Sequence, residues 1–209
     1  MYADDTVKSF LAQTAAHQPT PGGGSVAALT GAMGVALLEM VVSYTVDNKK
    51  CRAVRERVLP LRAELADYHA GFLELMEEDM RAYQHFTEVR ALPRRTEEEK
   101  AHRRSMMAEA LKQAADVPLR TVQACERTLL LAETLLNVGN PNLVSDIGVG
   151  ACLLGAALEG AALNVRVNLT HIRDSEYTSR VRWELSGIME RALARKRGVA
   201  EECADRVSS

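Results

Sequence analysis

The fold is decided by residues 19–46, PTPGGGSVAALTGAMGVALLEMVVSYTV. Three glycines lead directly into a long apolar run, which predicts a helix over residues 25–46 that is buried on several sides. Ser25 stands at the predicted N-cap, and the first free N–H groups of the helix point back into the glycine turn. A glycine turn at a helix N-terminus can hold an anionic or carbonyl-bearing ligand, but the same residues also make an ordinary tight turn.

A second apolar run covers residues 147–167 and is equally rich in alanine and glycine. Its small residues, like Gly31 and Gly34 of the first run, allow a neighbouring helix to approach closely. Length alone admits both runs as membrane spans. However, Glu39 and Glu159 lie inside them, and a carboxylate inside a membrane is costly. We therefore predict two buried helices at the centre of a helical core, completed by a second subunit.

The rest of the chain shows the spacing of amphipathic helices, and no segment alternates with the period of two that a strand requires. Pro60 and Pro118 predict a kink or an interruption in two of these helices. The fold class is therefore all-α, a single domain of long antiparallel helices around two buried Ala/Gly-rich helices. The surrounding helices are predicted over residues 3–17, 49–89, 96–136 and 174–197, which places the domain at 1–197 and leaves 198–209 as a frayed tail.

Charge and cysteine content exclude several classes of protein. The 209 residues carry a net charge of −2, which gives no electrostatic footprint for nucleic acid. The N-terminal sequence MYADDTVKSF lacks the basic and apolar regions of a signal peptide. Four cysteines without CxxC spacing and five scattered histidines predict reduced thiols and no metal site. We expect a cytoplasmic protein with no nucleic-acid or membrane partner.

Asp79 interrupts an apolar stripe. Phe72, Met76, Tyr83 and Phe86 follow helical spacing, and the pattern expects an apolar residue at position 79. A carboxylate on a buried face must be paired, protonated or functional. The pattern leaves two interpretations open: a buried, hydrogen-bonded aspartate or an acid/base of an active site.

Other polar residues flank the two apolar helices. Lys49 and Lys50 follow the first, where the helix dipole favours lysine; the alternative is a clamp for substrate carboxylates. Asn140, Asn142 and Asp146 precede the second, and such Asx-rich loops are usually only turns. The alternative is that this polar cluster contributes to a binding site.

Further polar residues lie within the two helices. Asn164 and Asn168 are four residues apart and share a face, so their amides either bind a heterocycle or cross-link helices. Glu39 and Glu159 either pair with an arginine or a backbone N–H at a helix contact, or one of them lines the pocket.

The chain resembles the cyclodeaminase/cyclohydrolase family in the segment PGGGSVAALTGAMG, in the step Asp79-x-x-Ala82-Tyr83 and in GNPNLVSDIGVGACLLGAALEGAALNVRVNL. This family includes the C-terminal domain of bifunctional formiminotransferase-cyclodeaminase and stand-alone methenyltetrahydrofolate cyclohydrolases. The resemblance runs from about residue 5 to residue 195. It implies an all-helical dimer with a folate pocket near the subunit interface and with Asp79 as the catalytic aspartate. The residues implied to line that pocket are Gly22, Gly23, Gly24 and Ser25.

The resemblance implies hydrolysis of 5,10-methenyltetrahydrofolate to 10-formyltetrahydrofolate, with no cofactor beyond this substrate. Asp79 would take the proton from water, backbone N–H groups after Gly24 would hold the pterin carbonyl or an anionic tail, and Lys49 or Lys50 would meet glutamyl carboxylates. One alternative is cyclodeamination of 5-formiminotetrahydrofolate with release of ammonia. The chain contains no formiminotransferase domain, which favours the hydrolase. A further alternative is a helical folate-binding protein without catalysis.

Overall fold

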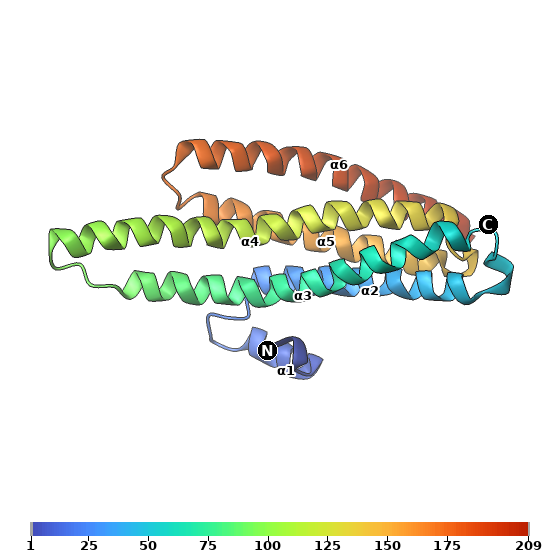
Figure 1. Ribbon diagram of the computed structural model, residues 1–209, viewed down its shortest axis with the longest axis horizontal. Helices are drawn as coiled ribbons and strands as arrows, with labels where there is room; N and C mark the ends of the chain where they lie inside the picture. Colours follow the sequence, from blue (N-terminus) through green and yellow to red (C-terminus); the bar gives the residue numbers. More distant parts are fainter. Residues whose placement is uncertain (1, 209) are drawn as a thin grey trace.

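The computed structural model describes residues 2–208, and within these residues it is built from helices joined by short connections (Figure 1). Three single-turn 3-10 helices stand beside six α-helices. The 3-10 helices are Tyr2–Asp4, Lys49–Cys51 and Pro141–Leu143, and the α-helices are α1 (Val7–Ala15), α2 (Gly23–Asp47), α3 (Arg55–Ala91), α4 (Glu97–Val138), α5 (Val144–Leu169) and α6 (Ser175–Ser208).

Helices α2 and α5 form the centre of the bundle, as the sequence predicts, and they run antiparallel to each other (Figure 1). Glycines allow their close approach. A methyl group at Gly34 would lie 2.9 Å from Cγ of Leu154 on α5, and one at Gly31 would lie 2.5 Å from the Phe72 ring on α3. Side chains larger than hydrogen at these positions would force the helices apart, so glycine sets the packing distance here.

Helices α3 and α4 form a long hairpin in front of α2 and α5, and its tip extends beyond the rest of the bundle (Figure 1). Helix α6 packs on α5 and α4. The short helix α1 lies to one side and is anchored by Phe10, which is buried. This layering leaves the N-terminus of α2 and the C-terminus of α5 at the same end of the bundle, against the middle of α3 and α4.

Neither helix is interrupted at its proline, because α3 runs through Pro60 and α4 runs through Pro118. The predicted interruption at Pro118 and the restart at Pro60 are therefore wrong, whereas the alternative of a kink at Pro60 stays a prediction. A proline inside a helix leaves the carbonyl four residues earlier without its N–H partner. For Pro118 that carbonyl is Ala114 O, and it accepts a hydrogen bond of 2.5 Å from Nδ2 of Asn168 on α5. Pro60 is exposed, so the corresponding carbonyl can be hydrated.

The C-terminal end also differs from the prediction. Helix α6 continues through Ser208, where the sequence predicted a helix to 197 and a frayed tail over 198–209. Val199 and Cys203 are buried, and Arg206 donates a hydrogen bond of 2.6 Å to the backbone oxygen of Leu136. The last turns of α6 are therefore held against α4 by the Arg206 hydrogen bond and lie against α5 through Cys203, which is close to Gly148.

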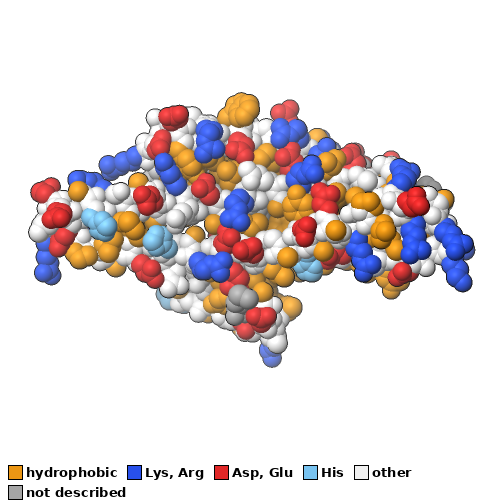
Figure 2. All heavy atoms as spheres, in the orientation of Figure 1, with side chains coloured by type: hydrophobic (Ala, Val, Ile, Leu, Met, Phe, Trp, Pro, Cys, Tyr) orange, Lys and Arg blue, Asp and Glu red, His pale blue; other side chains and the backbone are white. Residues whose placement is uncertain are grey.

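Charged side chains of both signs are scattered over the visible face, with hydrophobic side chains between them (Figure 2). By contrast, Gly23–Asp47 and Pro141–Leu169 are each long and apolar enough to cross a membrane by length and composition alone. Their most apolar windows are 56% and 50% buried inside the bundle. Packing against each other and against α3 and α4 therefore accounts for about half of each apolar window.

Candidate functional site

A cavity of about 380 Å³ opens at the end of the bundle where α2 begins and α5 ends. This volume is within the usual range for small-molecule pockets. Its walls come from the glycine turn, the middle of α3, one turn of α4 and the last turns of α5. The lining residues are Pro19, Thr20, Gly22, Gly23, Gly24, Asp79, Ala82, Tyr83, Phe86, Leu111, Ala114, Asn164, Val167, Asn168 and His171.

Asp79 lines this cavity and contacts Ser25, although the two residues are 54 positions apart. Ser25 itself is fully buried and does not line the cavity, in contrast to the prediction. Oγ of Ser25 donates a hydrogen bond of 2.7 Å to Oδ2 of Asp79, and the backbone N–H of Ser25 also donates to this carboxylate. Helix α2 begins at Gly23 with Gly22 as its N-cap, and no side chain caps it from within the helix. The prediction that Ser25 is the N-cap is therefore wrong, because Asp79 of α3 satisfies the helix N-terminus instead.

Gly24 makes this contact possible. A side chain at position 24 would overlap Oδ1 and the carboxyl carbon of Asp79. The glycine turn thus lets a carboxylate lie directly against the first turn of α2. Both the backbone N–H groups and the helix dipole at this end favour a negative charge.

Burial acts in the opposite direction. Desolvation raises the pKa of the Asp79 carboxyl above its usual value, and the two hydrogen bonds from Ser25 offset only part of this shift. The carboxyl therefore takes up a proton at a higher pH than an exposed aspartate does. A group that accepts and releases a proton closer to neutrality suits general acid–base catalysis.

Several lining residues were not predicted as site residues. Tyr83 and Phe86 were assigned to an apolar core stripe, but they form one wall of the cavity. His171 was counted among the scattered histidines, and only its position just after α5 brings it here. Asn164 and Asn168 had a usable signal, because their shared helix face was visible in the sequence.

The remaining predicted binding residues lie at the end of the bundle opposite the cavity. Lys49 and Lys50 follow the C-terminus of α2, about 37 Å from its N-terminus at 1.5 Å per residue. Asn140, Asn142 and Asp146 precede or begin α5 at that same end. Within one copy of the chain, the structure does not bring any of these five residues to the cavity.

Several backbone N–H groups at this opposite end already have partners. The backbone N–H of Asn140 donates to Thr45 Oγ1 at 2.9 Å, and Oδ1 of Asn140 accepts from the N–H of Asn142 at 3.1 Å. Likewise, the N–H of Lys50 donates to Asn48 Oδ1 at 2.9 Å. These contacts are those of well-formed turns.

Neither glutamate of the central helices lines the cavity. Oε2 of Glu39 is hydrogen-bonded to Nδ1 of His69 on α3 at 2.7 Å, whereas Glu159 is exposed on α5. Among residues 2–208, no group of three or more His, Cys, Asp or Glu side chains has an arrangement that could hold a metal ion.

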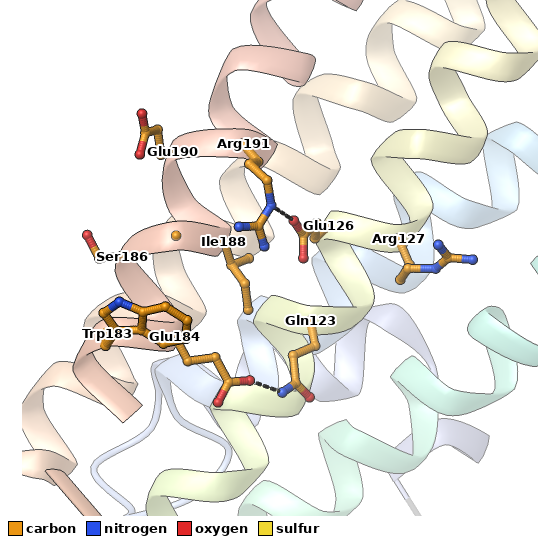
Figure 3. A pocket seen from close by; sticks show the side chains of 10 residues that line it. Gln123, Glu126, Arg127, Trp183, Glu184, Ser186, Ile188, Glu190 and Arg191 are labelled. Carbon is orange, nitrogen blue, oxygen red and sulfur yellow. Dashed lines mark hydrogen bonds and ion pairs between the residues drawn. The ribbon is translucent and has the colours of Figure 1, made fainter. Parts of the chain in front are cut away.

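A larger hollow of about 610 Å³ lies on the surface between α4 and α6 (Figure 3). Its charged and amide side chains pair across the hollow, with Arg191 Nε donating to Glu126 at 2.7 Å and Gln123 Nε2 donating to Glu184 at 2.6 Å. Trp183 lies along its outer rim and is 81% exposed. Since these polar groups already satisfy one another, the smaller cavity at Asp79 is the better candidate site.

Known proteins resemble this chain over its full length. It is 37% identical over 215 residues to a methenyltetrahydrofolate cyclohydrolase of Methylorubrum extorquens, and the alignment covers 100% of both proteins. It is 30% identical over 189 residues to the formimidoyltransferase-cyclodeaminase of Mus musculus, covering 90% of this chain and 35% of that protein. The chain thus spans about a third of the length of such bifunctional relatives.

A solved structure has the same fold. The crystal structure of formiminotetrahydrofolate cyclodeaminase from Thermotoga maritima superimposes with a TM-score of 0.81, covers 100% of this chain and 98% of its own, and is 26% identical. The sequence profile of the Formiminotransferase-cyclodeaminase family matches residues 6–187, which is most of the chain. The protein therefore belongs to the formiminotransferase-cyclodeaminase family.

Proposed function

We propose that this protein hydrolyses 5,10-methenyltetrahydrofolate to 10-formyltetrahydrofolate, using Asp79 as the catalytic base. The observation that carries the proposal is the Asp79 carboxylate, which faces the cavity, is held by Ser25 and has a raised pKa. The full-length similarity to a protein named methenyltetrahydrofolate cyclohydrolase supports the choice of reaction.

The substrate is a cation whose positive charge is spread over N5, N10 and the carbon between them. The Asp79 carboxylate stabilises this charge and takes one proton from water as the water oxygen bonds to that carbon. The protonated carboxyl then gives its proton to N5 as the C–N5 bond breaks. The hydroxyl on the same carbon loses its proton to solvent and becomes the formyl oxygen, so that one proton is released overall.

A second reaction uses the same groups. In cyclodeamination of 5-formiminotetrahydrofolate, N10 attacks the formimino carbon and ammonia leaves after protonation. The structural similarity to a protein named formiminotetrahydrofolate cyclodeaminase favours this alternative. We expect Asp79 to serve it as the proton carrier as well.

Absorbance of the methenyl chromophore distinguishes the two reactions. Purified protein supplied with 5,10-methenyltetrahydrofolate should accelerate the loss of this absorbance over the buffer rate. Supplied with 5-formiminotetrahydrofolate, a deaminase would instead raise the absorbance and release ammonia. No change with either folate would overturn the proposal.

We further propose that the protein is a homodimer whose interface is the outer face of α2 and α5. Large apolar side chains along this face are exposed in the single chain, namely Val26, Met33, Tyr44, Val149, Leu163 and Val167. Because α2 and α5 pack side by side, these residues form one continuous apolar face. A contiguous apolar surface of this kind marks an interface, and a two-fold contact lets it cover itself.

The charges at the ends of this face favour one arrangement of the two copies. Asp47 is exposed at the C-terminus of α2, and Arg166 is exposed near the C-terminus of α5, at the other end of the bundle. A two-fold axis across the helices brings the Asp47 end of one copy toward the Arg166 end of the other. It also brings Lys49, Lys50 and the loop 140–146 of the second copy toward the first copy's cavity.

We therefore assign Lys49, Lys50, Asn140, Asn142 and Asp146 to a site completed by the second copy. Met33→Glu tests the interface, because it places a charge at the middle of the apolar face. The variant should be monomeric by light scattering and should have lost most activity while keeping its helical circular dichroism. Trp183→Glu is the matched control on α6, and it should remain dimeric. A wild-type protein that is monomeric at assay concentration would contradict this part.

The proposed reaction requires no cofactor beyond the tetrahydrofolate substrate. We place the protein in the cytoplasm, where reduced folates and reduced thiols occur together. All four cysteines are free thiols, which agrees with a reducing compartment.

A further inference from the structure

The α5 wall of the cavity carries two asparagine amides whose orientation is fixed by the protein. Asn164 Nδ2 donates to the backbone oxygen of Gly160 at 2.9 Å, and Asn168 Nδ2 donates to the backbone oxygen of Ala114 at 2.5 Å. A backbone carbonyl can only accept a hydrogen bond, so the nitrogen of each amide must face it. One N–H of each amide is used in this way, so each side chain still offers its oxygen as an acceptor and its second N–H as a donor.

These two oxygens remain open. Neither Oδ1 accepts a hydrogen bond from residues 2–208, and neither is among the buried side-chain atoms that lack a partner. Both residues are half-buried and both line the cavity. The two residues are four positions apart, so they stand one helical turn from each other on the same wall.

Proline chemistry explains why Asn168 is held so firmly. Pro118 has no N–H, so Ala114 O lacks its usual partner within α4 and turns outward. Asn168 supplies the missing donor across the α4–α5 contact. The amide is thus locked by a defect in the neighbouring helix, which leaves its oxygen pointing away from α4.

The opposite wall adds another acceptor, the Asp79 carboxylate. A ligand that uses these acceptors presents hydrogen-bond donors to α5 and positive charge to Asp79. We infer that Asn164 and Asn168 accept hydrogen bonds from the amino-pyrimidine edge of the pterin, principally from its 2-amino group, and thereby turn the reacting carbon toward Asp79. This inference rests on the proposed folate activity.

The test compares 5,10-methenyltetrahydrofolate with its counterpart in which a methyl group replaces the 2-amino group. A site built to accept a hydrogen bond discriminates against a ligand that lacks the donor, so the wild type should prefer the natural substrate by roughly 10- to 100-fold in kcat/KM. In Asn164→Leu and in Asn168→Leu this preference should fall at least several-fold, because only the natural substrate loses a contact.

Two further variants separate binding from folding. Asn168→Leu leaves Ala114 O unpaired, and the added change Pro118→Ala restores an N–H to that carbonyl. The double variant should regain melting temperature but not the preference for the natural substrate. Asn137→Leu is the matched control, because Asn137 on α4 makes the same kind of amide contact, to Glu133 O, away from the cavity.

The outcomes are distinguishable from failure of the proposed activity. If the wild type turns over neither compound, the proposed activity is wrong. The preference is then measured as the ratio of the equilibrium dissociation constants of the two folates, in the wild type and in the asparagine variants. If both asparagine variants keep the full wild-type preference, in turnover or in binding, the inference is overturned. Equal treatment of the two compounds by the wild type would also overturn it.

Discussion

The two ends of the α2–α5 pair contain similar residues but have different properties. At the glycine-turn end, the carboxylate of Asp79 and the oxygens of Asn164 and Asn168 face a cavity. At the opposite end, the backbone N–H of Asn140 donates to Thr45, and the side-chain oxygen of Asn140 accepts from the backbone N–H of Asn142. Asparagine-rich sequence therefore marks a site only where some of its polar atoms stay open.

The difference has a physical origin in helix packing. At the glycine-turn end, α2 begins against the middle of α3, so a side chain from another helix caps it and a hollow remains beside the cap. At the opposite end, a short connection joins α4 to α5, and the loop satisfies its own hydrogen bonds. The following experiments test this contrast, from the largest expected effect to the smallest.

Asp79→Asn should have the largest effect. The amide keeps an oxygen that can accept the Ser25 hydrogen bonds, so the fold should persist, but it cannot take a proton from water. We expect kcat to fall by about 10²- to 10⁴-fold in the methenyl absorbance assay.

Glu78→Gln is the matched control for this change, because Glu78 is adjacent but pairs with Arg120 outside the cavity. It should retain near-wild-type turnover. An Asp79→Asn enzyme with more than a tenth of the wild-type rate would remove Asp79 from the chemistry.

Gly24→Ala should come next. The added methyl group would overlap the Asp79 carboxyl, which must then move away from its place against α2. A displacement of about 1 Å can lower the rate roughly 100-fold. Gly71→Ala on α3 is the control, since nothing lies within 4 Å of the added methyl, and it should stabilise the helix by about 0.5–1 kcal/mol. Equal kinetics for the two variants would show that Gly24 does not position the carboxylate.

Changes at the opposite end should be smaller and should affect a different parameter. If the second copy's loop completes the site, Lys49→Ala and Asn142→Ala should each raise KM about fivefold and leave kcat nearly unchanged, as expected for exposed polar contacts. Lys100→Ala, at the tip of the α3–α4 hairpin, should change neither KM nor kcat. An unchanged KM in both test variants would show that these residues only form turns and do not contribute to substrate binding.

The pH dependence of stability should show the smallest effect. The folded pKa of Asp79 is raised, so the folded protein holds this proton more tightly than the unfolded chain. Stability from this group is therefore present below the ordinary aspartate pKa and is lost as the pH rises through the raised value. Above that window, Asp79→Asn should melt at a higher temperature than the wild type, and the difference should shrink at acidic pH. An opposite sign would mean that the charged carboxylate stabilises α2 more than its burial costs.

Part of the candidate site could be predicted because individual residues depart from the pattern of the sequence around them. Asp79 broke an apolar stripe, and the glycines of residues 22–24 preceded an apolar helix. The resemblance to a family joined these two anomalies, and the structure shows them in contact. His171 had no such anomaly, because nothing in its neighbouring sequence marks it as facing a cavity.

The prolines show the complementary limit. Local rules predicted a break at Pro118, but they contain no information about a partner 50 residues away. Asn168 replaces the lost hydrogen bond, so α4 continues and a wall of the cavity is set at the same point. A rule based on one helix cannot anticipate a donor that belongs to another.

The sequence by itself determined the all-helical class, the two buried central helices and the unusual position of Asp79, because these follow from apolar spacing within one helix. The tertiary structure alone decided which polar residues share a cavity, which end of the bundle holds it and which amide atoms remain free. The reason is that helical periodicity acts over a few residues, whereas the site depends on how helices distant in sequence pack and which hydrogen bonds that packing leaves unmade.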